Sequence, residues 1–423
     1  VPVGQQQPEA LRGGVPDLPG HLLGRFLVGV AVGVVDARHA CAEAGADMIV
    51  ATLPANLNYI TTGYVCVNQD VLTRAECAIG YIPAKDKYVY IVGYAELPTV
   101  FEFAGLDTEV HFYGGAFCFE NGDKGNPFVE KIMAYQKEAH PTSADAWNAA
   151  VRANLPEGAT VAIDESRIFA SVLKNVEEKL SGYHVINATD IFMCARQVKH
   201  PEEVAGVEAS ARCASDAMTA ALANFKRGMT EYEIGELYNI ELAKRGAKPY
   251  FCTVTSQLRG AFSDTTNDKK RPIVEGDLIR FDFGCILNGY CSDLGRIAVV
   301  GKPTEKITSY YKALVAGLDA AVAIAKPGVT PGELFDTAME TVHKEGIAHY
   351  RRNHVGHGIG VECYDYPSIA HGNNTPIVEN MTFNLETPYY ELGWGGMMIE
   401  DTFVMTANGL RMLDTMTRDI ILL

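Results

Sequence analysis

Apolar and polar positions alternate differently along the two parts of the chain. Between residues 36 and 190, short apolar runs are separated by stretches in which apolar residues recur at helical spacing. The runs predict strands over 47–52, 88–93 and 160–164, and the stretches predict helices over 37–44, 126–136 and 166–179. Strands that alternate with helices are typical of a mixed α/β domain.

After residue 190 the pattern begins with two helices and continues mainly with strands. The first helix, over 202–223, is predicted by apolar residues at helical spacing: Val204, Val207, Ala211, Ala214 and Met218. Thr230 and Glu233 have capping-box spacing, which predicts a second helix that runs to residue 244. Strands are predicted over 249–300, helices over 309–325 and 332–345, and short strands from there to residue 423.

These patterns predict an α/β protein with two domains, as its 423 residues also suggest. Residues 1–190 are expected to form a small mixed α/β domain, and residues 191–423 a second, α+β domain. Residues 1–20 are rich in Gln, Gly and Pro and are expected to form an extended arm that packs on a partner subunit.

The composition is that of an ordinary globular protein, with 48 % apolar and 21 % charged residues. A net charge of −16 argues against nucleic acid or an anionic membrane as a partner. No run of 18 apolar residues lacks a charge, so no membrane-spanning helix is expected, and the run at 26–35 is too short and lacks a signal-peptide cleavage site. The ten cysteines include no C-x-x-C pair, which argues against a zinc ribbon. So many single cysteines are typical of a reducing compartment, and a cytoplasmic location is therefore expected.

The segment 278–300 carries the first candidate chemistry. Two strand-like runs flank Asn288 and Gly289, the strongest signal for a two-residue hairpin. In that register Leu287 faces Tyr290, and Asp282 and Asp293 share one face of the hairpin, about 7 Å apart. Burying both charges without a cation is costly, although two aspartates that face solvent would fit the pattern equally well.

Three further residues extend this pair. His357 lies between two glycines, and Glu386 and Glu400 each interrupt an apolar, strand-like run. Each alone is explained as a loop histidine or a salt-bridge partner. Together, four carboxylates and one imidazole suit two divalent ions such as Mn, Co, Fe or Zn, with a hydroxide held between them. The candidate metal ligands are therefore Asp282, Asp293, His357, Glu386 and Glu400.

The order of the motifs FDFG, SDLGR, GHGIG, NLETP and IEDT resembles that of the pita-bread metallohydrolases, which include prolidase, aminopeptidase P, methionine aminopeptidase and creatinase. Residues 55–63 and 194–204 are similar to the N-terminal signature and the linker of that family. The resemblance implies a creatinase/prolidase-type domain over 1–190 and a pita-bread domain over 191–423. It implies that Asp293 and Glu400 bridge two metals and that Glu386 also shuttles the proton. It further implies a homodimer in which one N-terminal domain narrows the partner's active-site mouth.

The sequence departs from the peptidases of that family where they carry substrate-handling histidines. The first of three such histidine positions falls in residues 262–268, which contain no histidine. The second position is occupied by Asn353, which is followed by His354, and the third by Tyr364. A tyrosine hydroxyl donates a hydrogen bond but does not carry a proton at neutral pH as imidazole does. The candidate catalytic residues are Glu386, His354 and Tyr364. The candidate substrate-binding residues are Asn353, Tyr364 and Arg296, which is also expected to pair with a metal carboxylate.

The first functional hypothesis is a metal-dependent hydrolase that cleaves a C–N bond in a small substrate, with an Xaa-Pro dipeptide as the first choice. The alternative is a non-peptidase of the same fold, either a creatinase- or ectoine-hydrolase-like amidohydrolase or a lyase. A binding protein that reuses the fold is a third hypothesis, and the presence of all five candidate ligands counts against it.

Overall fold

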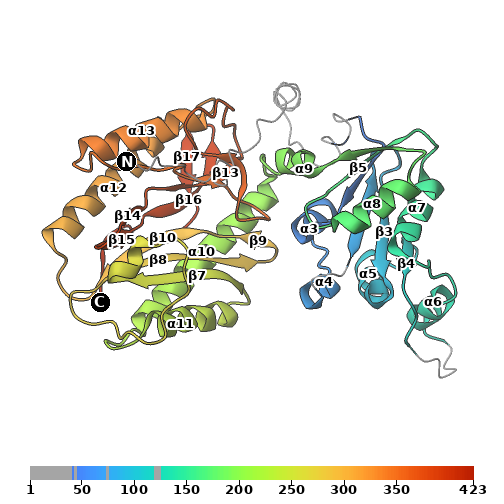
Figure 1. The fold of residues 1–423 in the computed structure, drawn as a ribbon, viewed down its shortest axis with the longest axis horizontal. Coiled ribbons are helices and arrows are strands. Elements are labelled where there is room, and N and C mark those ends of the chain that lie inside the picture. The colour runs from blue at the N-terminus through green and yellow to red at the C-terminus, as the bar shows by residue number, and fades with distance from the viewer. Residues whose placement is uncertain (1–40, 42–44, 73–75, 119–124) are drawn as a thin grey trace, which may run out of the picture.

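The computed structural model describes residues 41, 45–72, 76–118 and 125–423. The expected arm over 1–20, the apolar run at 26–35 and nearly all of the expected helix over 37–44 lie outside the described residues. The described chain forms two lobes, each built around its own sheet (Figure 1). We call residues 45–195 the first lobe and residues 201–423 the second lobe.

The first lobe contains a six-stranded mixed sheet in the order β4-β3-β2-β1-β5-β6. Its strands are β1 (Met48–Ala51), β2 (Cys77–Ile82), β3 (Lys87–Gly93), β4 (Glu109–Tyr113), β5 (Thr160–Ile163) and β6 (His184–Asn187). Its helices are α3 (Pro54–Thr61), α4 (Val67–Val71), α5 (Leu97–Ala104), α6 (Pro127–Tyr135), α7 (Ser143–Asn154) and α8 (Ala170–Lys179). Apolar side chains of the central strands point to both faces, so each face carries its own core cluster.

The connection between the lobes is α9 (Thr189–Ala195), whose buried residues pack in the core of the first lobe. The next helix, α10, begins at Pro201 in the second lobe. The domain boundary after residue 190 stays a prediction.

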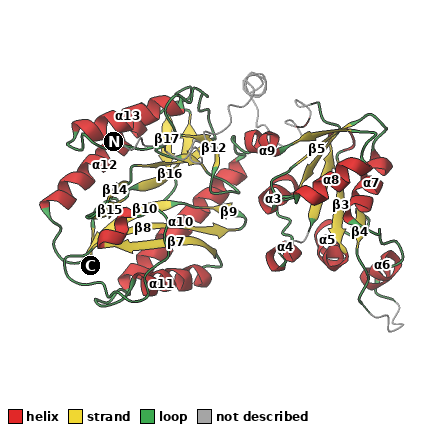
Figure 2. Cartoon of the chain, in the orientation of Figure 1, coloured by secondary structure: helices red, strands yellow, loops and turns green. Residues whose placement is uncertain are grey.

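The second lobe contains a ten-stranded sheet whose main path is β12-β11-β13-β16-β10-β8-β7. Its longer strands are β7 (Lys248–Ser256), β8 (Leu278–Leu287), β10 (Leu294–Val299), β13 (Thr382–Glu386) and β16 (Glu400–Thr406). Its shorter strands are β9 (Tyr290–Cys291), β11 (His357–Gly358), β12 (Asp365–Ser368), β17 (Gly409–Met412) and β18 (Ile421–Leu422), and β14 (Tyr389–Glu391) pairs separately with β15 (Gly395–Met397). Figure 2 shows these strands beside long helices.

Two pairs of helices cover this sheet. The pair α10 (Pro201–Ala223) and α11 (Glu231–Lys244) packs in one core cluster with β7, β8 and β10. The pair α12 (Glu305–Ile324) and α13 (Pro331–Lys344) packs in another cluster with β13 and β16. The predicted capping box at Thr230 and Glu233 is confirmed, and Thr330 and Glu333 repeat it at the start of α13.

One described helix, α12, is long and apolar enough to cross a membrane by length and composition alone. This helix contains Lys312 and Asp319, so it is not the uncharged apolar run that the sequence was searched for. Ile307, Leu314 and Leu318 of this helix are buried in the core cluster that it shares with α13. Packing against α13 accounts for its apolar character.

The β8–β10 hairpin has the predicted register. Leu287 pairs with Tyr290, and Asn288 and Gly289 both have positive φ angles, 51° and 85°, as a type I′ turn requires. Farther along the hairpin, Asp282 pairs with Gly295. Since side chains two residues apart on a strand point to the same face, Asp293 shares a face with Asp282.

Candidate metal centre and active-site cavity

Three candidate ligands from separate segments converge in the second lobe. Asp293 lies just before β10, His357 begins β11 and Glu400 begins β16, and all three are buried. Their ligating atoms lie within 4.8 Å of one another. His357 Nε2 is 3.5 Å from Asp293 Oδ2 and 4.0 Å from Glu400 Oε1. His357 Nδ1 lies 3.1 Å from the Gly358 carbonyl oxygen, so donation from Nδ1 leaves Nε2 free to face the two carboxylates.

The other two candidate ligands are placed by strand pairing. Asp282 pairs with Gly295, Gly295 pairs with Glu400, and Glu400 pairs with Glu386. These positions form one row across β8, β10, β16 and β13. Gly295 allows the Met398 and Glu400 side chains to pack closely against β10, since a Cβ there would clash with Met398 and lie 3.0 Å from the Glu400 Cβ. Strand pairing thus brings Asp282 to the same place as Glu386 and Glu400, which lie more than 100 residues later in the chain.

A cavity of about 190 Å³ opens beside this row. Its lining is almost entirely polar and comprises Ser263, Asp264, Asp282, Asp293, Arg352, His354, Tyr364, Glu386, Tyr390, Met398 and Glu400. His357 lies next to this lining, with its ring stacked on the Tyr364 ring at a centroid distance of 3.8 Å. A larger cavity of about 390 Å³ lies on the first lobe, but the described cluster of potential metal ligands is not there.

The carboxylates of this cavity strongly disfavour one another's charge. Burial, followed by the charge of Asp293, raises the pKa of Asp282 to about 8, and the same two causes raise the pKa of Glu400 well above its usual range. Burial also acts on Glu386, but Arg352 and His354 outweigh it and lower its pKa to about 2. Several buried carboxylates cannot all ionise together unless cations compensate them.

Unsatisfied oxygen atoms support the same interpretation. Asp293 Oδ1 and Glu400 Oε2 are buried and have no hydrogen-bond partner within the described part of the chain. Buried polar atoms normally have a partner, so atoms without one call for an explanation such as an ion. Carboxylate oxygens with one imidazole nitrogen suit Mn, Fe, Co or Zn. The residues therefore fit divalent metal ions.

The candidate ligands are held by further hydrogen bonds. Asn384 Nδ2 donates to Glu400 Oε1 across 2.9 Å, and the Cys363 thiol donates to Asp293 Oδ2 across 3.1 Å. Arg280 Nη1 lies 3.2 Å from Asp282 Oδ2. Such partners orient metal ligands and increase their affinity.

Two of the other candidate residues lie at the cavity. Tyr364 is 63 % exposed and lines the cavity, and its ring stacks on the ring of His357. His354 lines the cavity as well, with its Nδ1 3.0 Å from Glu386 Oε1. Both residues are therefore close enough to contact a substrate held at the carboxylates.

The structure corrects the expectation for Asn353. Its side chain is exposed and does not line the cavity, whereas its neighbours Arg352 and His354 do. The adjacent histidine, and not the residue in the family's histidine position, thus reaches the cavity.

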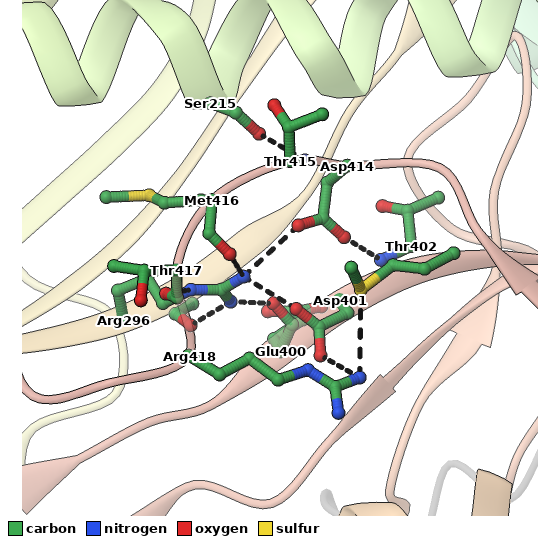
Figure 3. A network of polar contacts seen from close by, with 12 residues as sticks. Ser215, Arg296, Glu400, Asp401, Thr402, Asp414, Thr415, Met416, Thr417 and Arg418 are labelled. Carbon is green, nitrogen blue, oxygen red and sulfur yellow. Dashed lines mark hydrogen bonds and ion pairs between the residues drawn. The ribbon is translucent and has the colours of Figure 1, made fainter.

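The structure also corrects the expectation for Arg296, which is completely buried and does not line the cavity. Its guanidinium pairs with Asp401 across 2.6 Å and with Asp414 across 3.1 Å (Figure 3). It also donates to the backbone carbonyl oxygen of Glu400. Arg296 therefore holds the backbone of a candidate ligand, and it binds neither substrate nor a ligand carboxylate.

Sequence reasoning missed several cavity residues, notably Arg352 and Asp264. Arg352 Nη2 lies 3.4 Å from Glu386 Oε1, and the Arg352 guanidinium lies 5.5 Å from the centre of the Tyr390 ring. Tyr390 lines the cavity. Its neighbours in the sequence, Tyr389 and Trp394, pack against each other and are not part of the cavity lining. The pair Arg351 and Arg352, directly before Asn353, was the sequence signal that could have revealed Arg352.

A buried cluster of carboxylates and histidine in a small polar cavity, on a ten-stranded sheet covered by two helix pairs, defines a metallohydrolase. Residues 205–407 match the description "Metallopeptidase family M24". The chain is 30 % identical to the Xaa-Pro dipeptidase of Pyrococcus furiosus over 313 residues, which cover 73 % of this chain and 89 % of that protein. It belongs to this metallopeptidase family and is a metal-dependent hydrolase.

Other relatives agree. The Xaa-Pro dipeptidase of Lactobacillus helveticus is 27 % identical over 348 residues, which cover 81 % of this chain and 94 % of that protein. The solved prolidase from Thermococcus sibiricus superposes with a TM-score of 0.75 at 20 % identity, covering 92 % of this chain and 97 % of that one. The Xaa-Pro dipeptidase from Bacillus anthracis has a TM-score of 0.74 at 21 % identity, covering 96 % and 99 %. The predicted α/β class and pita-bread fold are confirmed.

Proposed function

We propose that this metallohydrolase cleaves Xaa-Pro dipeptides with two divalent ions held by Asp282, Asp293, His357, Glu386 and Glu400. The observation that supports this most strongly is the row of three carboxylates, Asp282, Glu400 and Glu386, in which Glu400 also lies in a cluster with Asp293 and His357. A cavity of about 190 Å³ favours a substrate as small as a dipeptide. The relatives named as Xaa-Pro dipeptidases support the same substrate.

When bound, the two ions would activate water as a nucleophile and polarise the scissile carbonyl group. Glu386 lies at the cavity between the other carboxylates and the pair Arg352 and His354. Its carboxylate would accept the proton from the attacking water and deliver it to the leaving nitrogen. Arg352 and His354 would hold this carboxylate in place during both transfers.

Two residues would stabilise the charge that develops on the substrate oxygen. Tyr364 lines the cavity and stacks its ring on that of His357, so its hydroxyl is the group that would donate. His354 lies on the same side of the cavity, with its ring centre 6.4 Å from that of Tyr364. Hydrogen-bond donors placed where negative charge develops lower the barrier.

We further propose manganese as the ion, two ions per chain, a homodimer and a cytoplasmic location. Oxygen-rich ligation supports manganese. The ten free cysteines support a reducing compartment. We also propose that residues 1–190 and 191–423 are the two domains, with the first narrowing the cavity mouth of the partner chain. The non-peptidase alternative is not favoured, because the named relatives are dipeptidases.

The test is an activity panel with protein purified in Mn²⁺. Ala-Pro and Leu-Pro should be hydrolysed, whereas Ala-Ala, cyclic amides and small amidines should not. Glu386→Gln should abolish turnover, and Glu379→Gln, at an exposed position, should leave it unchanged. Hydrolysis of an amidine or cyclic amide, with no cleavage of any Xaa-Pro dipeptide, would overturn the proposal.

A further inference from the structure

A buried arginine joins the two lobes at the point where the chain passes from one to the other. Arg196 follows α9, its side chain is 2 % exposed, and its guanidinium has partners in both lobes. Nη1 donates to Asn56 Oδ1 in α3 across 2.7 Å. Nη2 lies 2.7 Å from Asp365 Oδ1 and also donates to the Glu362 carboxylate. The rigid fork of a guanidinium allows these contacts to be made at once.

On the first lobe, the partner of Arg196 is itself firmly held. Asn56 Nδ2 donates to Asp164 Oδ2 across 2.7 Å. Asp164 is fully buried and also accepts from the backbone N–H groups of Thr52 and Leu53. Helix α3 is thereby fixed to the ends of β1 and β5.

On the second lobe, Arg196 holds both ends of a short segment that reaches the candidate metal centre. Between Glu362 and Asp365 lie only Cys363 and Tyr364. The Cys363 thiol donates to Asp293, and the Tyr364 ring stacks on His357. One guanidinium thus anchors the two residues that contact two candidate ligands.

Other contacts support this docking of the segment on the first lobe. Tyr366 packs against the core cluster of the first lobe, and its hydroxyl lies 3.5 Å from Asp190 Oδ1. A Cβ at Gly360 would lie 2.8 Å from Asp365 Oδ2, so the two ends of the segment pack closely on each other. Helix α3 also reaches the hairpin that carries Asp282 and Asp293, because a Cβ at Gly289 would lie 2.6 Å from Asn58 Nδ2.

We propose that Arg196 is a positioning residue that uses the first lobe, through Asn56, to hold segment 360–366 against the metal-binding residues. The described lining of the cavity comes from the second lobe, and the first lobe acts on it by fixing the placement of Cys363 and Tyr364. The kinetic consequence rests on the proposed dipeptidase function, whereas the placement of the segment does not.

The experiment compares three variants with the unchanged protein. Arg196→Lys keeps a cation near Asp365 but cannot reach Asn56 at the same time. Asn56→Ala leaves Arg196 and Asp365 paired and removes the link to the first lobe. The matched control is Arg411→Lys, which changes an arginine that pairs with Glu208 within the second lobe. Hydrogen–deuterium exchange of the metal-free proteins is followed over segment 360–366, and kcat and KM are measured with Ala-Pro.

We expect faster exchange in segment 360–366 for both Arg196→Lys and Asn56→Ala, with unchanged exchange over β13 and β16. We expect kcat to fall about 10-fold to 100-fold with little change in KM, as for other residues that orient a metal centre. The Arg411→Lys control should change neither property.

Unchanged exchange in the segment for both variants would overturn the proposal, and so would an increase spread evenly over both lobes. The second result would mean that Arg196 only stabilises the fold. If Arg196→Lys does not fold, the exchange of Asn56→Ala decides alone, and either of these two exchange results would overturn the proposal. If the unchanged protein cleaves no dipeptide, the proposed function fails, and the exchange measurement still decides the role of Arg196.

Discussion

The thiol of Cys363 donates a hydrogen bond to Asp293 Oδ2 across 3.1 Å, and this contact joins the segment after β11 to the carboxylate at the β8–β10 hairpin. The cysteine is buried, so its donor has little competition from water. The hydrogen bond orients the Asp293 carboxylate, whose Oδ1 has no hydrogen-bond partner within the described residues. Cys363 therefore helps to preorganise the site.

This contact predicts a role for Cys363 in metal affinity. Cys363→Ala should weaken Mn²⁺ binding about 10-fold to 100-fold, because Asp293 loses its orienting donor. Cys363→Ser keeps a donor and should lie between the two. Calorimetric titration of the metal-free protein measures the affinity, and Cys213→Ala, at a buried position in α10, is the control. Equal affinities for all four proteins would show that the thiol does not orient Asp293.

The buried carboxylates predict that metal stabilises the fold. A ligand that binds only the folded state adds about 2.7 kcal/mol at a concentration of 100 times its dissociation constant. Adding Mn²⁺ should therefore raise the melting temperature, and a chelator should reverse the change. Glu400→Ala should lose at least one ion by elemental analysis and show a smaller shift. The same shift in Glu400→Ala and in the unchanged protein would place the metal elsewhere.

Tyr364 is predicted to act through its hydroxyl group. Tyr364→Phe keeps the ring that stacks on His357 and should lower kcat about 10²-fold to 10³-fold with little change in KM, because one donor to the developing charge is lost. Tyr364→His should retain or improve cleavage of Ala-Pro. Metal content should be unchanged in both variants. A rise in KM alone would mean that Tyr364 only binds the substrate.

Arg296 is predicted to act on stability. Arg296→Met leaves Asp401 and Asp414 buried without this cation and should cost about 3–5 kcal/mol of unfolding free energy. Urea denaturation measures this change. Arg227→Gln, which removes an exposed ion pair with Glu275, should have little effect. If Arg296→Met were as stable as the unchanged protein while KM rose sharply, the substrate-binding role would have to be restored.

The proposed dimer predicts the mass of the protein in solution. Light scattering at micromolar concentration should give twice the chain mass of 45.9 kDa. Removing residues 1–40 tests whether the expected arm contributes to the dimer. A monomer of the full chain under these conditions would contradict the homodimer.

The sequence by itself determined the elements and the hairpin that depend on neighbouring residues. Thr230 and Glu233 marked the start of α11, and Asn288 and Gly289 fixed the register that places Asp282 and Asp293 on one face. Both are local effects, in which a cap or a turn decides the backbone within a few residues. Short strands such as β2 and β4 were missed, and α8 begins four residues later than predicted, at Ala170, because packing outweighs weak local preferences there.

Only the tertiary structure decided which distant side chains meet. The pairing of Gly295 with Glu400, and of Glu400 with Glu386, depends on which strands become neighbours, and no local pattern specifies that choice. The same holds for Arg352, which points into the cavity while the adjacent Asn353 points out. The five candidate ligands could be identified from the sequence because each lies in a short motif, and the motifs follow one another in the order typical of the family. The residues that hold them, Cys363 and Arg296 among them, act through contacts between segments 70 or more positions apart, and only the folded chain brings those segments together.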